Sequence, residues 1–137
     1  MKTIAILVLI LFITFINCTA QSYFTKNGKI SFFSAAPFED IKADNNQVIS
    51  IINGSTGDVR FSLLNNAFHF KNSVMEVHFN KSYIESAKYP KSSFKGRIND
   101  LSKVNFTTDG SYPVVVSGEL TIHGVTNKVS ISATISV

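Results

Sequence analysis

Hydrophobic and polar residues alternate along several stretches of the chain with a period of two residues. Val59, Phe61 and Leu63 alternate with polar neighbours, and the same alternation runs through residues 94–99 and 129–137. In a β-strand this period places successive side chains on opposite faces. Each of these strands is therefore predicted to have one dry face and one wet face, which is typical of an antiparallel sheet around a single core.

Two segments depart from this alternation. Residues 48–52 are apolar on both faces except for Ser50, and Phe32 and Phe33 place an aromatic ring on each side of one strand. We expect these strands either to be covered on their outer face or to contact a lipid or a partner.

A short helical element is predicted between the strands. Ser73 and Glu76 have the spacing of a capping box, in which the serine hydroxyl caps a free backbone amide and the glutamate reaches back. Met75 and Phe79 then fall on one face at positions i and i+4. The pattern predicts a helix near residues 74–80.

The chain after this helix is predicted to be irregular over residues 81–88. Pro90 disfavours helix in the residue before it, so the next strand is expected to start there. The whole pattern indicates a mainly β protein with one short helix after the third or fourth strand. No internal repeat or linker divides it, and about 120 residues are enough for one domain with a real core.

The first twenty residues have the layout of a secretory signal peptide. Lys2 is their only charge, an apolar run follows, and Cys18-Thr19-Ala20 offers small residues at the cleavage site. The apolar run is shorter than the roughly 20 residues of a membrane span. We therefore expect a signal peptide over residues 1–20 and a periplasmic or secreted domain over residues 21–137.

Cysteine content and charge narrow the function further. Cys18 is the only cysteine, so the mature domain is predicted to rely on packing rather than on disulfides. A lipoprotein acylated at Cys18 is the less favoured alternative, because Phe15 and Asn17 stand where aliphatic and small residues are expected. The formal net charge is +4, but the lysines are scattered rather than gathered in a stripe. A nucleic-acid partner is not expected, whereas a weak attraction to anionic membrane surfaces stays open.

The sequence carries no pattern typical of a catalytic or metal site. His69, His78 and His123 are far apart and lack a short ligand spacing, and the neighbouring side chains of Glu39-Asp40 diverge on an extended chain. We therefore expect no enzyme activity, no metal and no cofactor. His69 and His123 are expected on strand surfaces or in turns. His78 lies on the predicted helix and either orients it or presents a polar group at a cavity mouth.

Two separated motifs carry a resemblance to a known family. They are Val77-His78-Phe79-Asn80-Lys81-Ser82-Tyr83, which runs on to Tyr89-Pro90 and Phe94-Lys95-Gly96, and Leu120-Thr121-Ile122-His123-Gly124-Val125-Thr126. Gly28-Lys29-Ile30-Ser31-Phe32 and Thr56-Gly57-Asp58-Val59-Arg60-Phe61 precede them in a matching order. With these motifs the chain resembles the YceI-like family, which are secreted antiparallel β-barrels that bind long apolar lipids.

This resemblance implies a lipocalin-like β-barrel that binds a polyisoprenoid or similar long-chain lipid in its interior, as a periplasmic carrier or sequestering protein. The helix and residues 83–90 would form a lid. The apolar pocket candidates are Phe32, Phe61, Leu63, Phe68, Phe70, Met75, Phe79, Phe94, Leu120 and Ile122. His78 and Tyr83 are candidates for a polar contact at the pocket mouth.

Members of the family usually continue with further strands beyond the one that begins near Val129, whereas the alternation here is still running at Val137. We therefore expect a C-terminally truncated barrel, with a pocket open along one side and an unpaired sheet edge that invites a homodimer. The alternative function is a cell-envelope β-module that binds a protein partner and no ligand. An enzyme acting on a lipid is a weaker alternative, because no acid, base or nucleophile is visibly paired.

Overall fold

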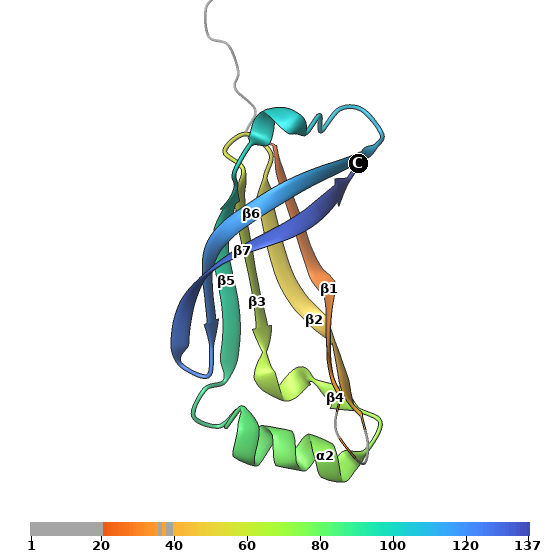
Figure 1. The fold of residues 1–137 in the computed structure, drawn as a ribbon, viewed down its shortest axis with the longest axis vertical. Helices are drawn as coiled ribbons and strands as arrows, with labels where there is room; N and C mark the ends of the chain where they lie inside the picture. Colours follow the sequence, from red (N-terminus) through yellow and green to blue (C-terminus); the bar gives the residue numbers. More distant parts are fainter. Residues whose placement is uncertain (1–20, 36, 38–39) are drawn as a thin grey trace, which may run out of the picture.

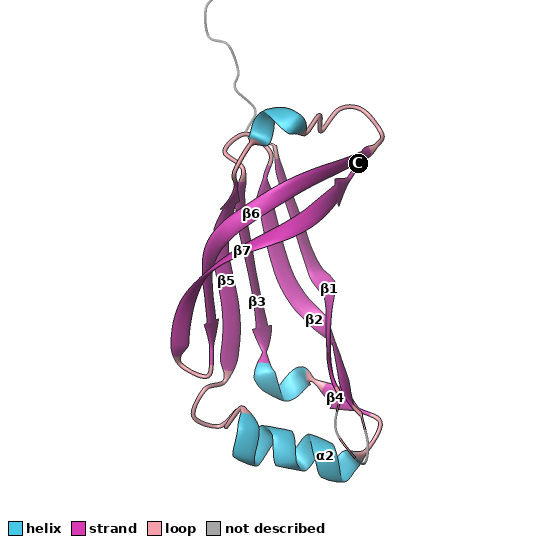
Figure 2. Ribbon diagram, in the orientation of Figure 1, coloured by secondary structure: helices cyan, strands magenta, loops and turns pink. Residues whose placement is uncertain are grey.

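The computed structural model describes residues 21–35, 37 and 40–137, so the expected signal peptide, Cys18 and Glu39 lie outside the described residues (Figure 1). The strands are β1 Ser22–Ser34, β2 Ile41–Asn53, β3 Asp58–Leu64, β4 His69–Phe70, β5 Lys91–Ile98, β6 Ser111–Ile122 and β7 Val125–Ser136. The helical elements are η1 Asn65–Ala67, α2 Ser73–His78, the π-helix η2 Phe79–Tyr83 and η3 Leu101–Lys103 (Figure 2). Within the described part of the chain, no helix has both the length and the apolar character needed to cross a membrane.

The strands form one antiparallel sheet. Its order is β1-β2-β3-β5-β6-β7, and the short β4 pairs with β2. Figure 1 shows the sheet curled into a half-barrel, with α2 across one end and η3 at the other. This confirms the predicted mainly β fold, with one short helix after the fourth strand. Strands β1 and β7 form the two edges of this sheet.

The predicted alternation places the apolar residues on the concave side of the sheet. Phe61 of β3 pairs with Phe94 of β5, and Phe94 pairs with Leu120 of β6. Residues that are directly opposite each other share a face, so these three side chains form one row. Their neighbours Arg60 and Lys95 pair with each other on the outer face. The interior of the half-barrel is therefore built from the dry faces of all the long strands.

Two clusters of buried residues fill this interior. One is centred on Ala43, Val48, Leu63 and Phe68, and the other on Phe94, Ile98, Val114 and Val116. Phe61 packs against both clusters, and its ring stacks on Phe94 with 4.9 Å between centroids. Phe94 is only 1% exposed, and burial of a phenylalanine contributes about 1.5–3 kcal/mol. The Phe61–Phe94 stack joins the two clusters into one core.

Two glycines allow β5 and β6 to approach closely. Gly96 and Gly118 pair directly across these strands. A Cβ at Gly118 would overlap the backbone carbonyl of Lys95, and a Cβ at Gly96 would overlap the Phe94 ring. The missing side chains thus leave room both for the neighbouring strand and for the buried ring.

The predicted capping box at the start of the helix is wrong. Asn72 is the N-cap, and its side-chain oxygen accepts hydrogen bonds from the backbone amides of Val74 and Met75. Ser73 is instead the first helical residue, and Glu76 accepts from the backbone amide of Phe70. Asparagine caps helices as well as serine does. Because Asn72 and Ser73 are adjacent, the sequence pattern placed the N-cap one residue too late.

The irregular stretch predicted over residues 81–88 is also partly wrong. Helical chain continues beyond α2 as η2, and the Ile84 amide donates to the Phe79 carbonyl five residues earlier. Ile84 is buried, which favours one more wide turn over an early end of the helix. The start of the next strand after Pro90 is confirmed, because β5 begins at Lys91.

The two segments that are apolar on both faces divide between core and surface. Val48 belongs to the core, whereas Ile49 and Ile51 are exposed on the outer face. Phe32 faces the interior, and Phe33 is exposed. The described residues therefore do not cover the outer face of β1 and β2.

Candidate functional site

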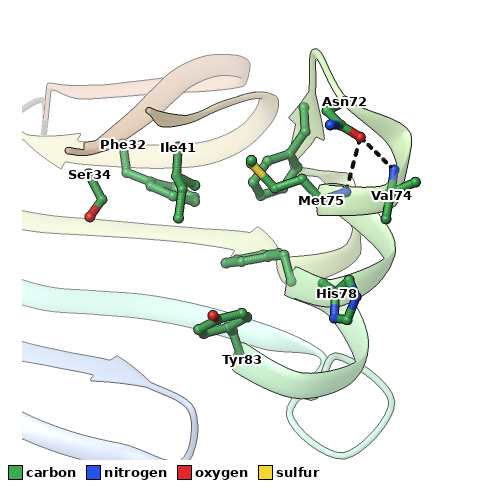
Figure 3. A pocket seen from close by; sticks show the side chains of 10 residues that line it. Phe32, Ser34, Ile41, Asn72, Val74, Met75, His78 and Tyr83 are labelled. Carbon is green, nitrogen blue, oxygen red and sulfur yellow. Dashed lines mark hydrogen bonds between the residues drawn. The ribbon is translucent and has the colours of Figure 1, made fainter. Parts of the chain in front are cut away.

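The candidate site is a cavity of about 590 Å³ at the helical end of the half-barrel. We call residues 73–89, which carry α2 and η2, the lid. The cavity lies between the lid and the ends of β1 and β2 (Figure 3). It is lined by Phe32, Ser34, Ile41, Phe70, Asn72, Val74, Met75, His78, Phe79 and Tyr83.

Three phenylalanine rings, Phe32, Phe70 and Phe79, line this cavity, and a fourth, Phe68, packs behind them. The centroid of Phe32 lies 5.4 Å from Phe68, 5.8 Å from Phe70 and 5.5 Å from Phe79. Phe79 also contacts Phe68 and Phe70, at 5.7 and 5.1 Å. Contacts of this kind add to the stability that area burial alone provides. The cluster joins the lid to β1 and β4.

The polar groups at the cavity are few. The side-chain oxygen of Asn72 is already engaged in capping α2. Tyr83 is 70% exposed, and Figure 3 shows its ring at the cavity with His78 nearby on the same helical segment. Among the residues that the structure describes, no aspartate or glutamate lines the cavity. The described residues therefore offer a largely apolar surface, and besides Asn72 its polar groups are those of Ser34, His78 and Tyr83.

The predicted site residues divide into three groups. Phe32, Phe70, Met75, His78, Phe79 and Tyr83 all line the cavity, and Phe68 packs directly behind it. Phe61, Leu63, Phe94 and Leu120 lie in the core clusters and not in the lining of this cavity. Ile122 is exposed beside the β6–β7 turn.

Four lining residues were absent from the predicted set, namely Ser34, Ile41, Asn72 and Val74. Ser34 and Ile41 pair across β1 and β2, on the same face as Phe32. Extending the alternation of β1 by one step beyond Phe32 would have found Ser34. Val74 lies on the lid and lines the cavity. Its position depends on where the helix begins, and the sequence pattern placed the N-cap at Ser73 instead of Asn72.

Asn65 anchors the base of the lid, and it is fully buried at 0% exposure. Its side-chain amide donates to the Tyr89 carbonyl at 2.6 Å, and its backbone amide donates to the Pro90 carbonyl at 2.9 Å. The Ser92 hydroxyl in turn donates to the side-chain oxygen of Asn65. Every polar group of this side chain is therefore paired, as buried polar groups require. Nothing in the sequence pattern marks Asn65.

The same C-terminal end of the lid, residues 85–89, also contacts the turn between β6 and β7. The Glu85 carboxylate oxygen Oε2 lies 2.6 Å from the His123 Nε2 atom. The Tyr89 ring packs edge-on against the His123 ring, with 4.4 Å between centroids. A hydrogen bond with Tyr89, followed by the charges of Tyr89 and Glu85, raises the pKa of Lys88 above its usual value. The two motifs that carried the family resemblance thus meet in space.

The described residues contain no group of three or more His, Cys, Asp or Glu side chains that could hold a metal ion. His69 is exposed on β4, and its Nδ1 atom lies 3.9 Å from the Glu76 carboxylate. His78 ends α2 at the cavity, and His123 lies in the β6–β7 turn.

Comparison with known protein families decides the classification. The family model of the YceI-like domain matches residues 13–137. The chain belongs to the YceI-like family. The match covers every described element of the structure, including the lid and the β6–β7 hairpin. No curated protein matches the chain.

The chain is also similar to two solved structures. A polyisoprenoid binding domain from Saccharophagus degradans, implicated in plant cell wall breakdown, is 16% identical with a TM-score of 0.70. That alignment covers 86% of this chain and 68% of that domain. The YceI protein of Campylobacter jejuni is 11% identical over 83% of this chain and 54% of that protein, with a TM-score of 0.46. The likeness to the Saccharophagus domain shows that the half-barrel has the YceI fold.

Proposed function

We propose that this protein binds a long apolar lipid, of the polyisoprenoid class, in the cavity between the lid and the ends of β1 and β2. The observation that carries the proposal is the cluster of four phenylalanine rings, three of which line a cavity of about 590 Å³, with no carboxylate among the described lining residues. This volume lies within the usual range for small-molecule sites. An aromatic, uncharged lining suits a hydrocarbon chain better than a polar metabolite.

Membership of the YceI-like family supports this proposal. The Saccharophagus domain that shares the fold is itself described as polyisoprenoid binding. The open inner face of the half-barrel continues from the cavity toward Phe61 and Leu120, which are partly buried. A long chain that extends beyond the cavity would therefore find further apolar surface along the sheet.

The energetics of burial are sufficient for useful affinity. Each buried CH₂ group contributes about 0.8 kcal/mol, so ten buried carbons would contribute roughly 8 kcal/mol. That figure corresponds to a Kd of about 1 μM before the entropy of ordering the chain is subtracted. A lipid of several isoprene units is therefore needed, because a shorter chain would bury too few carbons.

Native mass spectrometry tests the proposal directly. Protein purified from a host that makes isoprenoids should retain a lipid, which organic extraction then identifies. The variant Met75→Glu places a charge in the cavity wall and should lose the lipid. Val77→Glu is the matched control, because Val77 lies two residues away on α2, is 51% exposed and does not line the cavity. Repeated recovery of empty wild-type protein, folded by circular dichroism, would overturn the proposal.

We further propose that the protein acts as a carrier or sequestering protein in the periplasm and catalyses no reaction. This is supported by the described cavity lining, which holds no carboxylate, and by the signal-peptide layout of residues 1–20. Expression of the full chain, followed by cell fractionation, should recover a periplasmic protein that begins at Gln21. Recovery from the cytoplasm with an intact Met1, or chemical change of a co-purified lipid, would contradict it.

A protein partner, or a second copy of the chain, is a second candidate function. It is favoured by the two edge strands β1 and β7, and by Ile131, which faces the inner side of β7 and is 44% exposed. Light scattering after gel filtration should then detect a dimer. Ile131→Lys should dissociate it, whereas Ser132→Lys, on the outer face of the same strand, should not. A monomeric wild-type protein would argue against self-association.

A further inference from the structure

Two residues of the described chain other than glycine have a positive φ. Glu85 has a φ of 48° and His123 a φ of 51°. Such a conformation is uncommon for residues with a side chain, and it is found where the surrounding structure holds it in place. The two residues are 38 positions apart in sequence, yet their side chains contact each other. The positive φ at each residue and the contact between the two side chains therefore belong to one local arrangement.

His123 is an unusual residue for the turn that it occupies. His123 and Gly124 form a two-residue turn between β6 and β7, and both have a positive φ. Turns of this kind favour Asn-Gly or Asp-Gly, because asparagine and aspartate tolerate the left-handed conformation best. The hairpin alone therefore gives no reason for histidine. The reason lies in what the imidazole touches outside the hairpin.

The turn packs tightly on the end of the lid. A Cβ at Gly124 would lie 2.5 Å from the Tyr89 ring, so the glycine is needed for the contact as well as for the turn. The Glu85 carbonyl accepts hydrogen bonds from the amides of Lys88 and Tyr89, both at 2.8 Å. These bonds make residues 85–89 a compact turn that presents Glu85 and Tyr89 to His123.

We propose that Glu85 and His123 are positioning residues that latch the lid onto the β6–β7 turn, and that this latch sets how quickly lipid enters and leaves the cavity. The inference rests on the proposed lipid-binding function. In the part of the chain that the structure describes, the Glu85–His123 contact is the one side-chain hydrogen bond between the lid and β6, β7 or their turn.

The position of the latch explains how it acts on the cavity. The start of the lid is bonded to β4, where the Glu76 carboxylate accepts from the Phe70 amide, and its C-terminal end is held by Asn65 through the Tyr89 carbonyl. Tyr83, which lines the cavity, lies two residues before Glu85. Without the latch, the segment between Tyr83 and Tyr89 keeps its bond to Asn65 and the packing of Tyr89 on Gly124, but it loses its side-chain hydrogen bond to the opposite wall of the half-barrel. Opening of the lid then requires fewer contacts to break.

If His123 only stabilised the hairpin, a residue that suits the turn better would leave lipid exchange unchanged. A substitution that suits the turn but cannot reach Glu85 therefore tests the latch. His123→Asn suits the turn better than histidine but is too short to reach Glu85. Glu85→Gln removes the charge from the other partner. Thr126→Val is the control, because the Thr121 and Thr126 hydroxyls are bonded at 2.8 Å in the same hairpin and do not contact the lid.

The first measurement is the dissociation rate of an anthraniloyl-labelled geranylgeraniol, displaced by excess unlabelled geranylgeraniol in a stopped-flow fluorimeter. His123→Asn and Glu85→Gln are each expected to release the probe about two- to fivefold faster, as for the loss of a partly exposed hydrogen-bonded pair. The double variant should release it no faster than either single variant, since both remove the same contact. The thermal midpoint of His123→Asn should stay at or above that of the wild type. Unchanged release rates, or effects that multiply independently, would overturn the latch.

The second measurement needs no ligand, so it distinguishes failure of the latch from failure of the proposed function. Hydrogen exchange of the Ile84 and Ser86 amides, which donate to the Phe79 and Asn80 carbonyls within the lid, reports opening of this segment. Exchange in His123→Asn should be about two- to fivefold faster than in the wild type, with Thr126→Val unchanged. If the wild type takes up no probe, the lipid-binding proposal fails, and the exchange result alone decides the latch. Equal exchange in the wild type and His123→Asn overturns it.

Discussion

At the scale of single residues, the buried asparagine Asn65 holds the C-terminal end of the lid. It makes hydrogen bonds through its side-chain amide, its side-chain oxygen and its backbone amide, and it has no exposed surface. Removing one partner from a buried hydrogen bond leaves the other partner unsatisfied, and this costs more than the bond itself contributes.

We expect Asn65→Ala to lower the free energy of unfolding by about 2–4 kcal/mol, because the Ser92 hydroxyl and the Tyr89 carbonyl would lose their partner. Urea denaturation followed by circular dichroism measures this. Asn127→Ala is the control, since Asn127 is exposed on β7. A change below about 0.5 kcal/mol in Asn65→Ala would show that the base of the lid does not depend on this residue.

Asp58 supplies a pH-dependent contribution at the start of β3. Hydrogen bonds from the Thr56 hydroxyl and then from Arg97 lower its pKa below the ordinary value of 3.8. A carboxylate whose pKa is lowered on folding stabilises the native state above its unfolded pKa, and this stabilisation is lost as the pH falls through the folded pKa. Asp58→Asn should thus be less stable than the wild type at neutral pH, and the difference should shrink below about pH 4.

Denaturation midpoints in urea across a pH series measure this difference for Asp58→Asn. Asp109→Asn serves as the control, because the described residues form no ion pair or side-chain hydrogen bond with Asp109. A difference between the wild type and Asp58→Asn that stays constant down to the acid transition would contradict the assignment.

At the scale of secondary-structure elements, the alternation of β3 and β5 was sufficient to predict which face of each strand is dry. The alternation could not predict how deeply each side chain on the dry face is buried. Phe61 and Phe94 occupy equivalent positions in the pattern, but Phe94 is fully buried because it lies between Phe61 and the glycine pair of β5 and β6. Depth depends on neighbours from other strands, and so the predicted site mixed core residues with cavity residues.

The lid shows the same limit of prediction. Its existence, its apolar residues Met75 and Phe79, and its end at Pro90 follow from local patterns. Its anchors do not, because Asn65 and His123 act on lid residues 24 and 38 positions away in sequence. The position of the cap was ambiguous for a local reason, since Asn72 and Ser73 are adjacent and both suit an N-cap.

Substitution of these two adjacent residues tests which one caps α2. Asn72→Ala should lower the free energy of unfolding by about 1 kcal/mol, because the Val74 and Met75 amides lose their acceptor. Ser73→Ala should change it by less than about 0.5 kcal/mol, since alanine is a better helix former at the first helical position. Thermal denaturation at matched pH compares the two. A larger loss in Ser73→Ala would restore the capping box that the sequence predicted.

At the scale of the whole molecule, the cavity joins segments that are distant in sequence. Phe32 and Ile41 come from β1 and β2, whereas Met75, Phe79 and Tyr83 come from the lid. A lipid in contact with both groups would link one edge of the half-barrel to the helical end. Its binding free energy would then oppose global unfolding and not only local opening of the lid.

This linkage predicts the size of a thermal shift. A ligand that binds only the native state adds about 2.7 kcal/mol to the free energy of unfolding at a concentration 100 times its Kd. For a domain of this length we expect geranylgeraniol to raise the thermal midpoint by roughly 10 °C. Met75→Glu should show no rise, and Val77→Glu should rise as the wild type does, because only Met75 lines the cavity. Differential scanning calorimetry measures all three. Equal shifts in the wild type and Met75→Glu would place the bound lipid elsewhere on the half-barrel.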